Sequence, residues 1–319
     1  MEFTTLGRTG LKVSVAGLGS GGPSRLGRKK GVDKDQGVAL IRRAIDLGIN
    51  FFDTAENYGT EGVVGAAVKS VPRDSVVLST KYHAEGVSAN EIVDALDTAL
   101  RTMDTDYLDV FHLHGVLADE YDHAVDVLVP ALLRERERGK FRFLGITEGT
   151  ARDLGHAMLT RALKDDFWDV VMVAFNMMHQ GALDHVLPEA RKRGVGTLIM
   201  APARCQVGTP DRLVEALKAL AAEGKLPAAV GDSDDPLGFL MRDGGAKNLL
   251  DAAYRFARHA SGADVILFGT GNPDHLEANV ASLLSAPLHE ASMARLRAEF
   301  GKLKGVGLNQ IRRNERMPA

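Results

Sequence analysis

The chain has 319 residues, of which 45% are hydrophobic and 25% are charged, a balance typical of a globular protein with a sizeable core. Its formal net charge of -3 shows no basic bias of the kind that nucleic-acid partners require. The one cysteine, Cys205, excludes an intrachain disulfide framework and a multi-cysteine metal site. The first residues lack an apolar signal core, and no stretch reaches the ~18 apolar residues of a membrane span. We therefore expect a cytoplasmic protein without membrane, nucleic-acid or metal partners.

Eight short, nearly continuous apolar segments recur along the chain. They occupy residues 13–19, 49–55, 75–82, 108–115, 142–148, 169–176, 196–203 and 263–271. Continuous apolar runs of this length are typical of parallel strands that are covered on both faces. The segments therefore predict eight buried strands.

Amphipathic helical patterns separate these strands. They occupy residues 35–47, 61–69, 88–103, 121–137, 150–163, 181–193, 245–260 and 273–285. At the start of the third, Ser88 and Glu91 have the spacing of a capping box. The alternation of strands and helices predicts an α/β fold.

Eight strand–helix units match a (β/α)8 TIM barrel, which we expect to form one domain over residues 1–319. The competing fold is a doubly wound sheet, which needs a glycine-rich turn that opens a helix after the first strand. The segment GLGSGG at 17–22 resembles such a turn, but Pro23 and a polar loop follow it. The barrel is therefore the favoured fold.

Three segments fall outside the simple repeat. Residues 1–12 predict a hairpin across the barrel floor, with turns at Gly7 and Gly10. Residues 204–245 are too long for a structureless loop and contain a helical pattern at 210–223. We expect this loop to form one wall of the site, and its closure as a lid is a hypothesis. Residues 286–319 predict a C-terminal extension with a helix at 289–303.

Four polar residues lie at or just after the ends of three successive strands, namely Asp53, Tyr58, Lys81 and His114. Active sites of such barrels form at the carboxyl ends of the strands, so these side chains should converge. A phenol has a reference pKa near 10, and a nearby ammonium lowers it. A carboxylate can hold the ammonium, and an imidazole can hydrogen-bond a carbonyl oxygen. The set is suited to carbonyl reduction with an external hydride source. His112, on the same strand face as His114, is expected to be a satisfied core histidine.

A second motif, FGTGNPDHLEANV at 268–280, ends the last strand. Gly269, Thr270 and Gly271 form a turn, Asn272 can cap the next helix, and Pro273 suits its first position. Free N–H groups at such a helix start bind phosphate, and this is the usual phosphate site of barrels. The alternative is a simple glycine turn followed by a capped helix without a ligand.

These motifs resemble the aldo-keto reductase superfamily over nearly the whole chain. The matching segments are LGRTGLKVSVAGLGSGG at 6–22, GINFFDTAENYGTEGVVGAAV at 48–68, PRDSVVLSTK at 72–81, DYLDVFHLH at 106–114, GKFRFLGIT at 139–147 and GTGNPDHLEANV at 269–280. The family's catalytic Asp–Tyr–Lys–His tetrad falls on Asp53, Tyr58, Lys81 and His114.

The resemblance implies an NAD(P)(H)-dependent oxidoreductase that transfers hydride between nicotinamide and an aldehyde or ketone, or oxidises an alcohol or sugar in reverse. Tyr58 would be the general acid, assisted by Lys81 and Asp53, while His114 would orient the carbonyl oxygen. The alternative is a non-catalytic cofactor-binding protein that resembles the voltage-gated potassium channel β subunits. The intact tetrad favours the enzyme.

The resemblance also implies which residues contact the cofactor. They are Gly19, Ser20, Gly21, Asp53, Thr147, Glu148, Met172, Ala201, Pro202, Arg204, Gly269, Thr270, Gly271, His275 and Asn279. Around the nicotinamide, Thr147-Glu148 stands where the family has Ser-Asn, and Met172 replaces a Gln. Met200 replaces an aromatic residue that often stacks on the ring. We expect Glu148 to accept a hydrogen bond from the carboxamide.

At the phosphate end, Gly269 and His275 stand where NADPH-specific members have Lys and Arg. A neutral His binds a 2′-phosphate less well than Arg does. Asn279 matches an adenine-contacting Asn, and Arg204 is placed to contact the pyrophosphate. Frequency within the family favours NADPH, and NADH is the alternative.

Residues Asn57, Tyr82 and His83 should lie at the barrel mouth and are candidates for substrate contact. A basic cluster in the first loop is either a solvated surface or an electrostatic guide for an anion; it comprises Arg25, Arg28, Lys29 and Lys30. Trp168 precedes a strand at its far end, so we expect it to be a packing residue. The sequence does not indicate an oligomeric state.

Overall fold

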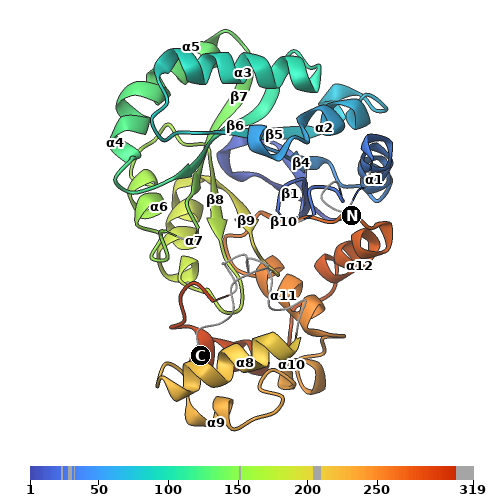
Figure 1. The fold of residues 1–319 in the computed structure, drawn as a ribbon, viewed down its shortest axis with the longest axis vertical. Coiled ribbons are helices and arrows are strands. Elements are labelled where there is room, and N and C mark those ends of the chain that lie inside the picture. The colour runs from blue at the N-terminus through green and yellow to red at the C-terminus, as the bar shows by residue number, and fades with distance from the viewer. Residues whose placement is uncertain (23, 28–30, 32, 151, 204–209, 307–319) are drawn as a thin grey trace.

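Eight parallel strands close into a barrel in the computed structural model, which describes residues 1–319 except 23, 28–30, 32, 151, 204–209 and 307–319 (Figure 1). The strand order around the barrel is β10-β3-β4-β5-β6-β7-β8-β9. The strands are β3 (Ala16–Gly19), β4 (Phe51–Asp53), β5 (Val77–His83), β6 (Leu108–Val116), β7 (Phe141–Glu148), β8 (Val170–Ala174), β9 (Gly196–Met200) and β10 (Val265–Phe268). The predicted (β/α)8 TIM barrel is therefore confirmed.

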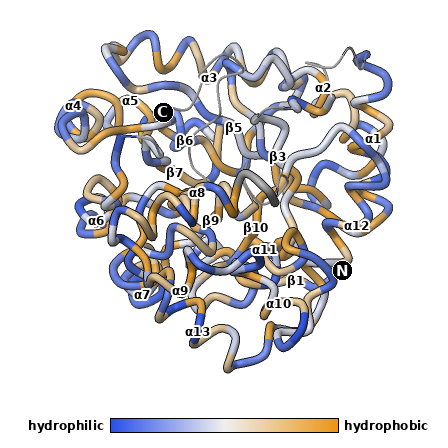
Figure 2. The backbone as a smooth tube through the Cα atoms, turned by 60° about the horizontal axis from the view of Figure 1, so that its bottom comes forward, coloured by the Kyte–Doolittle hydropathy of each residue, from blue (hydrophilic) through white to orange (hydrophobic). Residues whose placement is uncertain are grey.

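Helices surround the barrel, and hydrophilic and hydrophobic residues alternate along them (Figure 2). They are α1 (Lys34–Asp46), α2 (Glu61–Val68), α3 (Ala89–Met103), α4 (Tyr121–His123), α5 (Val129–Glu137), α6 (Ala157–Ala162), α7 (Ala182–Arg193), α11 (Leu249–Arg258) and α12 (Pro273–Leu283). The predicted capping box is present, because Ser88 accepts from the Glu91 N–H and Glu91 accepts from the Ser88 N–H. This box starts α3 at the residue after Ser88.

Two apolar layers hold the barrel and helices together. Inside the barrel, alternate strand residues such as Phe51, Val110 and Leu198 form one buried cluster. The residues between them face the helices and join a larger cluster with the inward helix faces, for example Phe52 and Leu144. Both strand faces are buried, which explains the continuous apolar runs.

Two of the predicted helices differ from the structure. The pattern at 150–163 becomes a helix only at Ala157, because Asp153 accepts from the N–H groups of Ala157 at 2.9 Å and Met158 at 2.8 Å. Its carboxylate thus takes the donors that a longer helix would bond internally. The pattern at 121–137 is interrupted by a π-helical stretch, Ala124–Leu128, just before Pro130 in the first turn of α5. Proline lacks the N–H of a regular α-helical bond, which accounts for the widened turn.

A hairpin of β1 (Phe3–Thr5) and β2 (Lys12–Ser14) closes the barrel floor, as the sequence predicts. Leu6, Leu11 and Val13 pack into the cluster inside the barrel. The predicted strand at 13–19 is thus divided, since its first residues belong to the hairpin and the barrel strand begins at Ala16. The hairpin thus covers the floor of the barrel, and the carboxyl ends of the strands lie at the opposite end, where sites of such barrels form.

The long loop after β9 carries α8 (Pro210–Ala222), α9 (Ala228–Gly231) and α10 (Phe239–Arg242), and they lie together at the bottom of Figure 1. Leu213, Leu217 and Phe239 are buried and belong to the larger apolar cluster between the strands and the helices, so this segment packs onto the main core. The helix α13 (Glu290–Phe300) follows α12, near the predicted bounds of 289–303. Closure of the loop as a lid stays a prediction.

Within the described part of the chain, no helix has both the length and the apolar character needed to cross a bilayer. The same residues contain no group of three His, Cys, Asp or Glu side chains arranged to hold a metal ion.

Candidate active site

The four residues of the predicted tetrad meet at the open end of the barrel, on three adjacent strands. Asp53 ends β4, Lys81 lies near the end of β5, and His114 lies near the end of β6. Tyr58 ends a 3₁₀ turn, Glu56–Tyr58, that Gly59 terminates in a left-handed conformation with a φ of 67°. Parallel strands in register bring their carboxyl ends together, which is why residues far apart in sequence converge.

Asp53 and Lys81 form a buried ion pair below this mouth. Lys81 Nζ donates to Asp53 Oδ2 at 2.7 Å and to the Thr54 carbonyl at 2.6 Å. The two side chains are only 1% and 6% exposed for Lys81 and Asp53 respectively. Lys81 Nζ also lies 5.1 Å from the centre of the Tyr58 ring. The ammonium is therefore fixed beside the phenol.

Burial by itself would lower the pKa of Lys81, but the Asp53 carboxylate and Tyr58 raise the pKa above its ordinary value. Lys81 is consequently a cation at neutral pH. Burial of an ion pair of this kind costs free energy, and removal of one partner strongly destabilises the fold because the other charge is left unpaired. The pair can therefore hold a positive charge at one place under Tyr58.

Tyr58 and His114 face each other at the mouth. The Tyr58 hydroxyl lies 3.5 Å from His114 Nε2, and the two rings are nearly perpendicular with centres 5.8 Å apart. Burial, with the charges of Lys81 and His83, lowers the pKa of His114 to about 3. A neutral imidazole has one donor and one acceptor nitrogen, so His114 can donate to an oxygen held beside Tyr58.

A second hydrogen-bond chain reaches the other oxygen of Asp53. Ser79 Oγ donates to Asp53 Oδ1 at 2.9 Å, and His112 Nε2 lies 3.1 Å from Ser79 Oγ. His112 is fully buried, as expected for a core histidine. The sequence reasoning nevertheless missed its link to Asp53. Ser79 lies two residues before Lys81, and His112 lies two residues before His114, so each pair shares one face of its strand. This spacing on neighbouring strands is the pattern that could have revealed the link.

Three hydroxyl groups support the same region, one from the loop after β3 and two from the loop after β4. Ser20 Oγ donates to the Asp53 carbonyl at 3.0 Å and lies 2.8 Å from Thr60 Oγ1. Thr60 Oγ1 in turn lies 2.9 Å from Thr54 Oγ1. Ser20, a predicted cofactor residue, therefore uses its hydroxyl to hold the backbone around Asp53.

Two other residues of the first loop contact Tyr58. A side chain at Gly21 would place Cβ 2.3 Å from the Tyr58 ring, so glycine is required there. The Arg25 guanidinium lies 5.9 Å from the ring centre, and Nη1 donates to the Tyr58 carbonyl at 3.3 Å. The predicted basic cluster thus places one charge at the site, while Arg28, Lys29 and Lys30 lie outside the described residues.

The residues predicted around the nicotinamide divide between the two faces of the barrel wall. Met172 and Met200 belong to the apolar cluster inside the barrel. Thr147 Oγ1 accepts a hydrogen bond at 2.7 Å from the N–H of Gly115, the residue that follows His114. This contact fixes the end of β6 where the register with β7 shifts. Thr147 therefore has a positioning contact within the chain.

Glu148 has partners that the sequence did not predict. Its carboxylate accepts from His156 Nδ1 at 2.8 Å and from the Ala174 N–H at 2.8 Å. Burial raises the pKa of Glu148 above its ordinary value, against the lowering effect of His156. The residues at 144, 146 and 148 share one strand face, which explains why Glu148 meets the start of α6. A carboxamide would have to share these oxygens.

The segment predicted to bind phosphate has the expected local structure. Asn272 Oδ1 accepts from the Asp274 N–H at 2.8 Å, and Pro273 opens α12. A Cβ at Gly269 would lie 3.0 Å from the Gly19 carbonyl oxygen, and one at Gly271 would lie 2.4 Å from the Gly27 Cα. The loops after β3 and β10 are therefore in close backbone contact, which requires glycine.

The remaining predicted residues lie around these loops. Thr270 and Asn279 are buried, whereas His275 is exposed on α12. Ala201 and Pro202 follow β9, and Ala201 has a left-handed φ of 59°. Arg204 and Cys205 lie outside the described residues.

The candidate substrate residues differ in exposure. Asn57 and His83 are exposed, and Tyr82 stacks on His83 with ring centres 4.3 Å apart. Tyr82 and His83 directly follow Lys81 on β5. Trp168 is fully buried and donates to the Tyr121 hydroxyl at 2.8 Å, so it is a packing residue as predicted.

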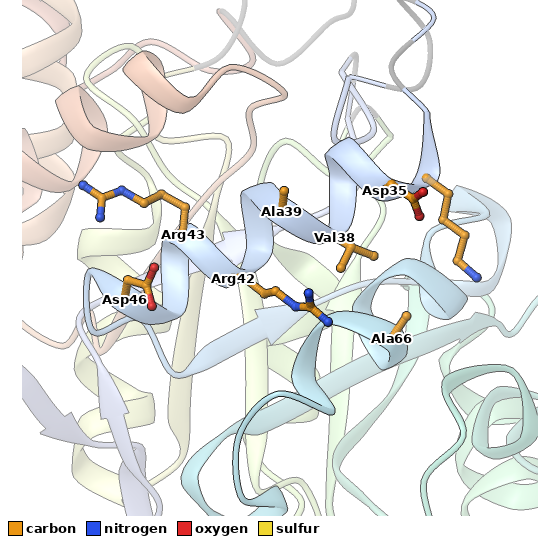
Figure 3. Close-up of a pocket in the computed structure, with 8 residues that line it drawn as sticks. Asp35, Val38, Ala39, Arg42, Arg43, Asp46 and Ala66 are labelled. Atoms are coloured by element: carbon orange, nitrogen blue, oxygen red, sulfur yellow. The ribbon is translucent and has the colours of Figure 1, made fainter.

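A hollow of about 550 Å³ lies elsewhere, over α1 and α2. Figure 3 shows Arg42 extending towards Ala66, while Arg43 points away from it. Arg43 pairs with Glu277 of α12 at 2.7 Å. None of the residues that line the hollow belongs to the predicted site.

Curated relatives of the chain are oxidoreductases by name. The chain is 36% identical to L-galactose dehydrogenase of Arabidopsis thaliana over 216 residues, which are 63% of this chain and 65% of that protein. It thus covers less than two thirds of that relative. It is 26% identical to the aldo-keto reductase YhdN of Bacillus subtilis over 311 residues, 87% of each protein.

Solved structures share the fold. The holo form of the aldo-keto reductase AKR11C1 from Bacillus halodurans has a TM-score of 0.70 and 21% identity, with 93% of this chain and 96% of that chain covered. An aldo/keto reductase from Klebsiella pneumoniae in complex with NADP and acetate has a TM-score of 0.68 and 22% identity, with 98% of each chain covered. The model of the aldo/keto reductase family matches residues 17–299. The chain therefore belongs to the aldo/keto reductase family.

Proposed function

We propose that this protein is an NAD(P)(H)-dependent oxidoreductase that interconverts an aldehyde or ketone and the corresponding alcohol, with Tyr58 as general acid and base. The observation that carries the proposal is the buried Asp53–Lys81 pair, whose ammonium lies 5.1 Å from the centre of the Tyr58 ring. Family membership supports the class of reaction.

The residues around the mouth fit a dinucleotide. The glycines at 19, 21, 269 and 271 let the loops after β3 and β10 pack closely against each other and against Tyr58, which gives the mouth a backbone-lined rim. The capped start of α12 offers N–H groups suited to phosphate. Asn279, buried on α12, is the proposed adenine contact, and Thr147 and Met172 are the proposed neighbours of the nicotinamide. When bound, reduced nicotinamide supplies the hydride.

The residues of the chain then supply the proton and hold the oxygen. Tyr58 donates its phenolic proton to the carbonyl oxygen as negative charge develops there. Lys81, held by Asp53, stabilises the phenolate that remains. Neutral His114 donates a hydrogen bond to the same oxygen and fixes its direction. A positioned general acid contributes ~10²–10⁴-fold to the rate, and preorganised donors at the oxygen add a similar factor of ~10²–10³.

The substrate class is a small carbonyl compound or, in the reverse direction, an alcohol such as a sugar. The similarity to a protein named L-galactose dehydrogenase supports the sugar alternative. A non-catalytic cofactor-binding role is not favoured, because the four tetrad residues are all present and are brought together.

Titration of the intrinsic fluorescence with NADPH and NADH, followed by a panel of aldehydes, ketones and sugars, tests the proposal. We expect binding of a nicotinamide cofactor and turnover of at least one compound class. Tighter binding of NADPH would agree with family frequency, whereas tighter binding of NADH would show that Gly269 and His275 have removed 2′-phosphate recognition. Tight cofactor binding without any turnover would support the non-catalytic alternative instead.

A further inference from the structure

We propose that His112 is a positioning residue for this reaction, acting through Ser79 on Asp53 and thereby on Lys81. The inference rests on the proposed function, because it assigns a role to residues behind the tetrad. It adds a supporting chain of two residues, His112 and Ser79. Neither of these residues contacts the reacting atoms.

The hydrogen-bond directions in this chain follow from the donors available. Ser79 Oγ–H donates to Asp53 Oδ1 at 2.9 Å, so its one proton is used there. His112 Nε2, 3.1 Å from Ser79 Oγ, must therefore be the donor in the second bond. This places the His112 proton on Nε2, and Nδ1 has no hydrogen-bond partner in the described structure. The chain runs from His112 through Ser79 to Asp53 without a break.

The environment of His112 keeps the imidazole neutral and in place. Burial, together with the charges of Lys81 and His114, lowers the pKa of His112 well below its ordinary value. A Cβ at Gly145 would lie 2.1 Å from His112 Nδ1, so the ring occupies a slot that only glycine leaves open on β7. The ring is thus held from two sides, by Ser79 on β5 and by Gly145 on β7.

The chain matters because the two oxygens of Asp53 have different partners. Oδ1 accepts from Ser79, and Oδ2 accepts from Lys81 Nζ at 2.7 Å. Without a donor at Oδ1, the carboxylate could rotate about its terminal torsion, which is broad for Asp. Rotation would weaken the bond from Lys81 Nζ to Asp53 Oδ2 and leave the ammonium on the Thr54 carbonyl, where it could shift relative to Tyr58. Small displacements of catalytic groups reduce rates strongly, up to ~10²-fold for ~1 Å.

The test is a double-mutant cycle with His112→Leu, Ser79→Ala and the double variant, measured as kcat and KM. We expect each single variant to lower kcat by about 10-fold, with KM for the cofactor unchanged within about 2-fold. Because both changes break one chain, the double variant should lose about as much as either single variant rather than the product of the two losses. His112→Gln, which keeps an N–H donor, should restore most of kcat.

His123→Leu is the matched control, since His123 bonds the Val87 carbonyl at 2.8 Å in the helix layer, away from the tetrad. It should lower stability without changing kcat. Three results would overturn the inference. The first is a kcat loss in the double variant that equals the product of the two single losses, and the second is an unchanged kcat in Ser79→Ala. The third is an equal kcat loss in His112→Gln and His112→Leu. If His112→Leu does not fold, Ser79→Ala and His112→Gln decide it alone.

Tyr58→Phe separates this inference from the function on which it rests. If Tyr58→Phe is inactive while the Ser79 and His112 variants turn over normally, only the positioning role is wrong. If Tyr58→Phe turns over normally, the proposed function itself is wrong.

Discussion

Individual side chains at the mouth are tuned by burial as much as by their neighbours. Lys81 stays charged because Asp53 offsets the effect of burial, whereas His114 lacks a carboxylate partner among its described contacts and is neutral. The mouth of the barrel thus contains one fixed cation and one neutral imidazole. This division suits a site that stabilises a phenolate and hydrogen-bonds a carbonyl oxygen.

The protonation of His114 is directly measurable. A base whose pKa is lowered to about 3 gains its proton only as the pH falls through that value, so the ring should stay neutral between about pH 5 and 8. Nitrogen-15 NMR of the imidazole side chains over this range should show a constant His114 signal.

Assignment of that signal uses His114→Asn, in which it disappears. A His114 midpoint near the reference value of 6.5 would contradict the burial and charge effects on which the neutral form depends.

At the scale of elements, the N-terminal hairpin shows how a short segment seals the barrel floor. Gly7 and Gly10 both have left-handed φ angles, of 47° and 71°. A Cβ at Gly7 would lie 2.3 Å from the Gly196 backbone nitrogen, whereas nothing lies within 4 Å of a Cβ at Gly10. The two glycines therefore serve different purposes, close packing in one case and backbone conformation in the other.

Alanine substitutions should separate these two effects. We expect Gly10→Ala to lower the free energy of unfolding by about 1 kcal/mol, the cost of a left-handed residue. Gly7→Ala should cost about 3 kcal/mol, because overpacking against β9 adds to that cost. Urea denaturation of both variants measures the difference. Equal losses would contradict the close contact between the hairpin and β9.

The sequence predicted most helices and strands but missed places where side chains compete for the hydrogen bonds of the backbone. Apolar runs located all eight barrel strands, and capping residues located the starts of α3 and α12. The start of α6 was wrong because the Asp153 side chain bonds two backbone donors, and periodicity contains no information on such contacts. The division of the first run between β2 and β3 was missed because both parts are equally apolar.

For the whole molecule, strand ends predicted the site better than individual residue properties did. Asp53, Lys81 and His114 converge because parallel strands end together, and this needs only the strand order. The partners of Glu148 and the placement of Arg25 against Tyr58 depend on side-chain direction and loop conformation. Spacing along the chain does not determine either of these.

The central claim is that Tyr58 is the proton donor of an NAD(P)(H)-dependent reaction, and Tyr58→Phe tests it most directly. The variant removes one hydroxyl and leaves the ring that packs on Gly21. We expect its cofactor affinity by fluorescence titration to equal that of the unmodified protein, while single-turnover reduction of a carbonyl substrate slows by ~10²-fold or more. Reduction by Tyr58→Phe at the rate of the unmodified protein would contradict this assignment.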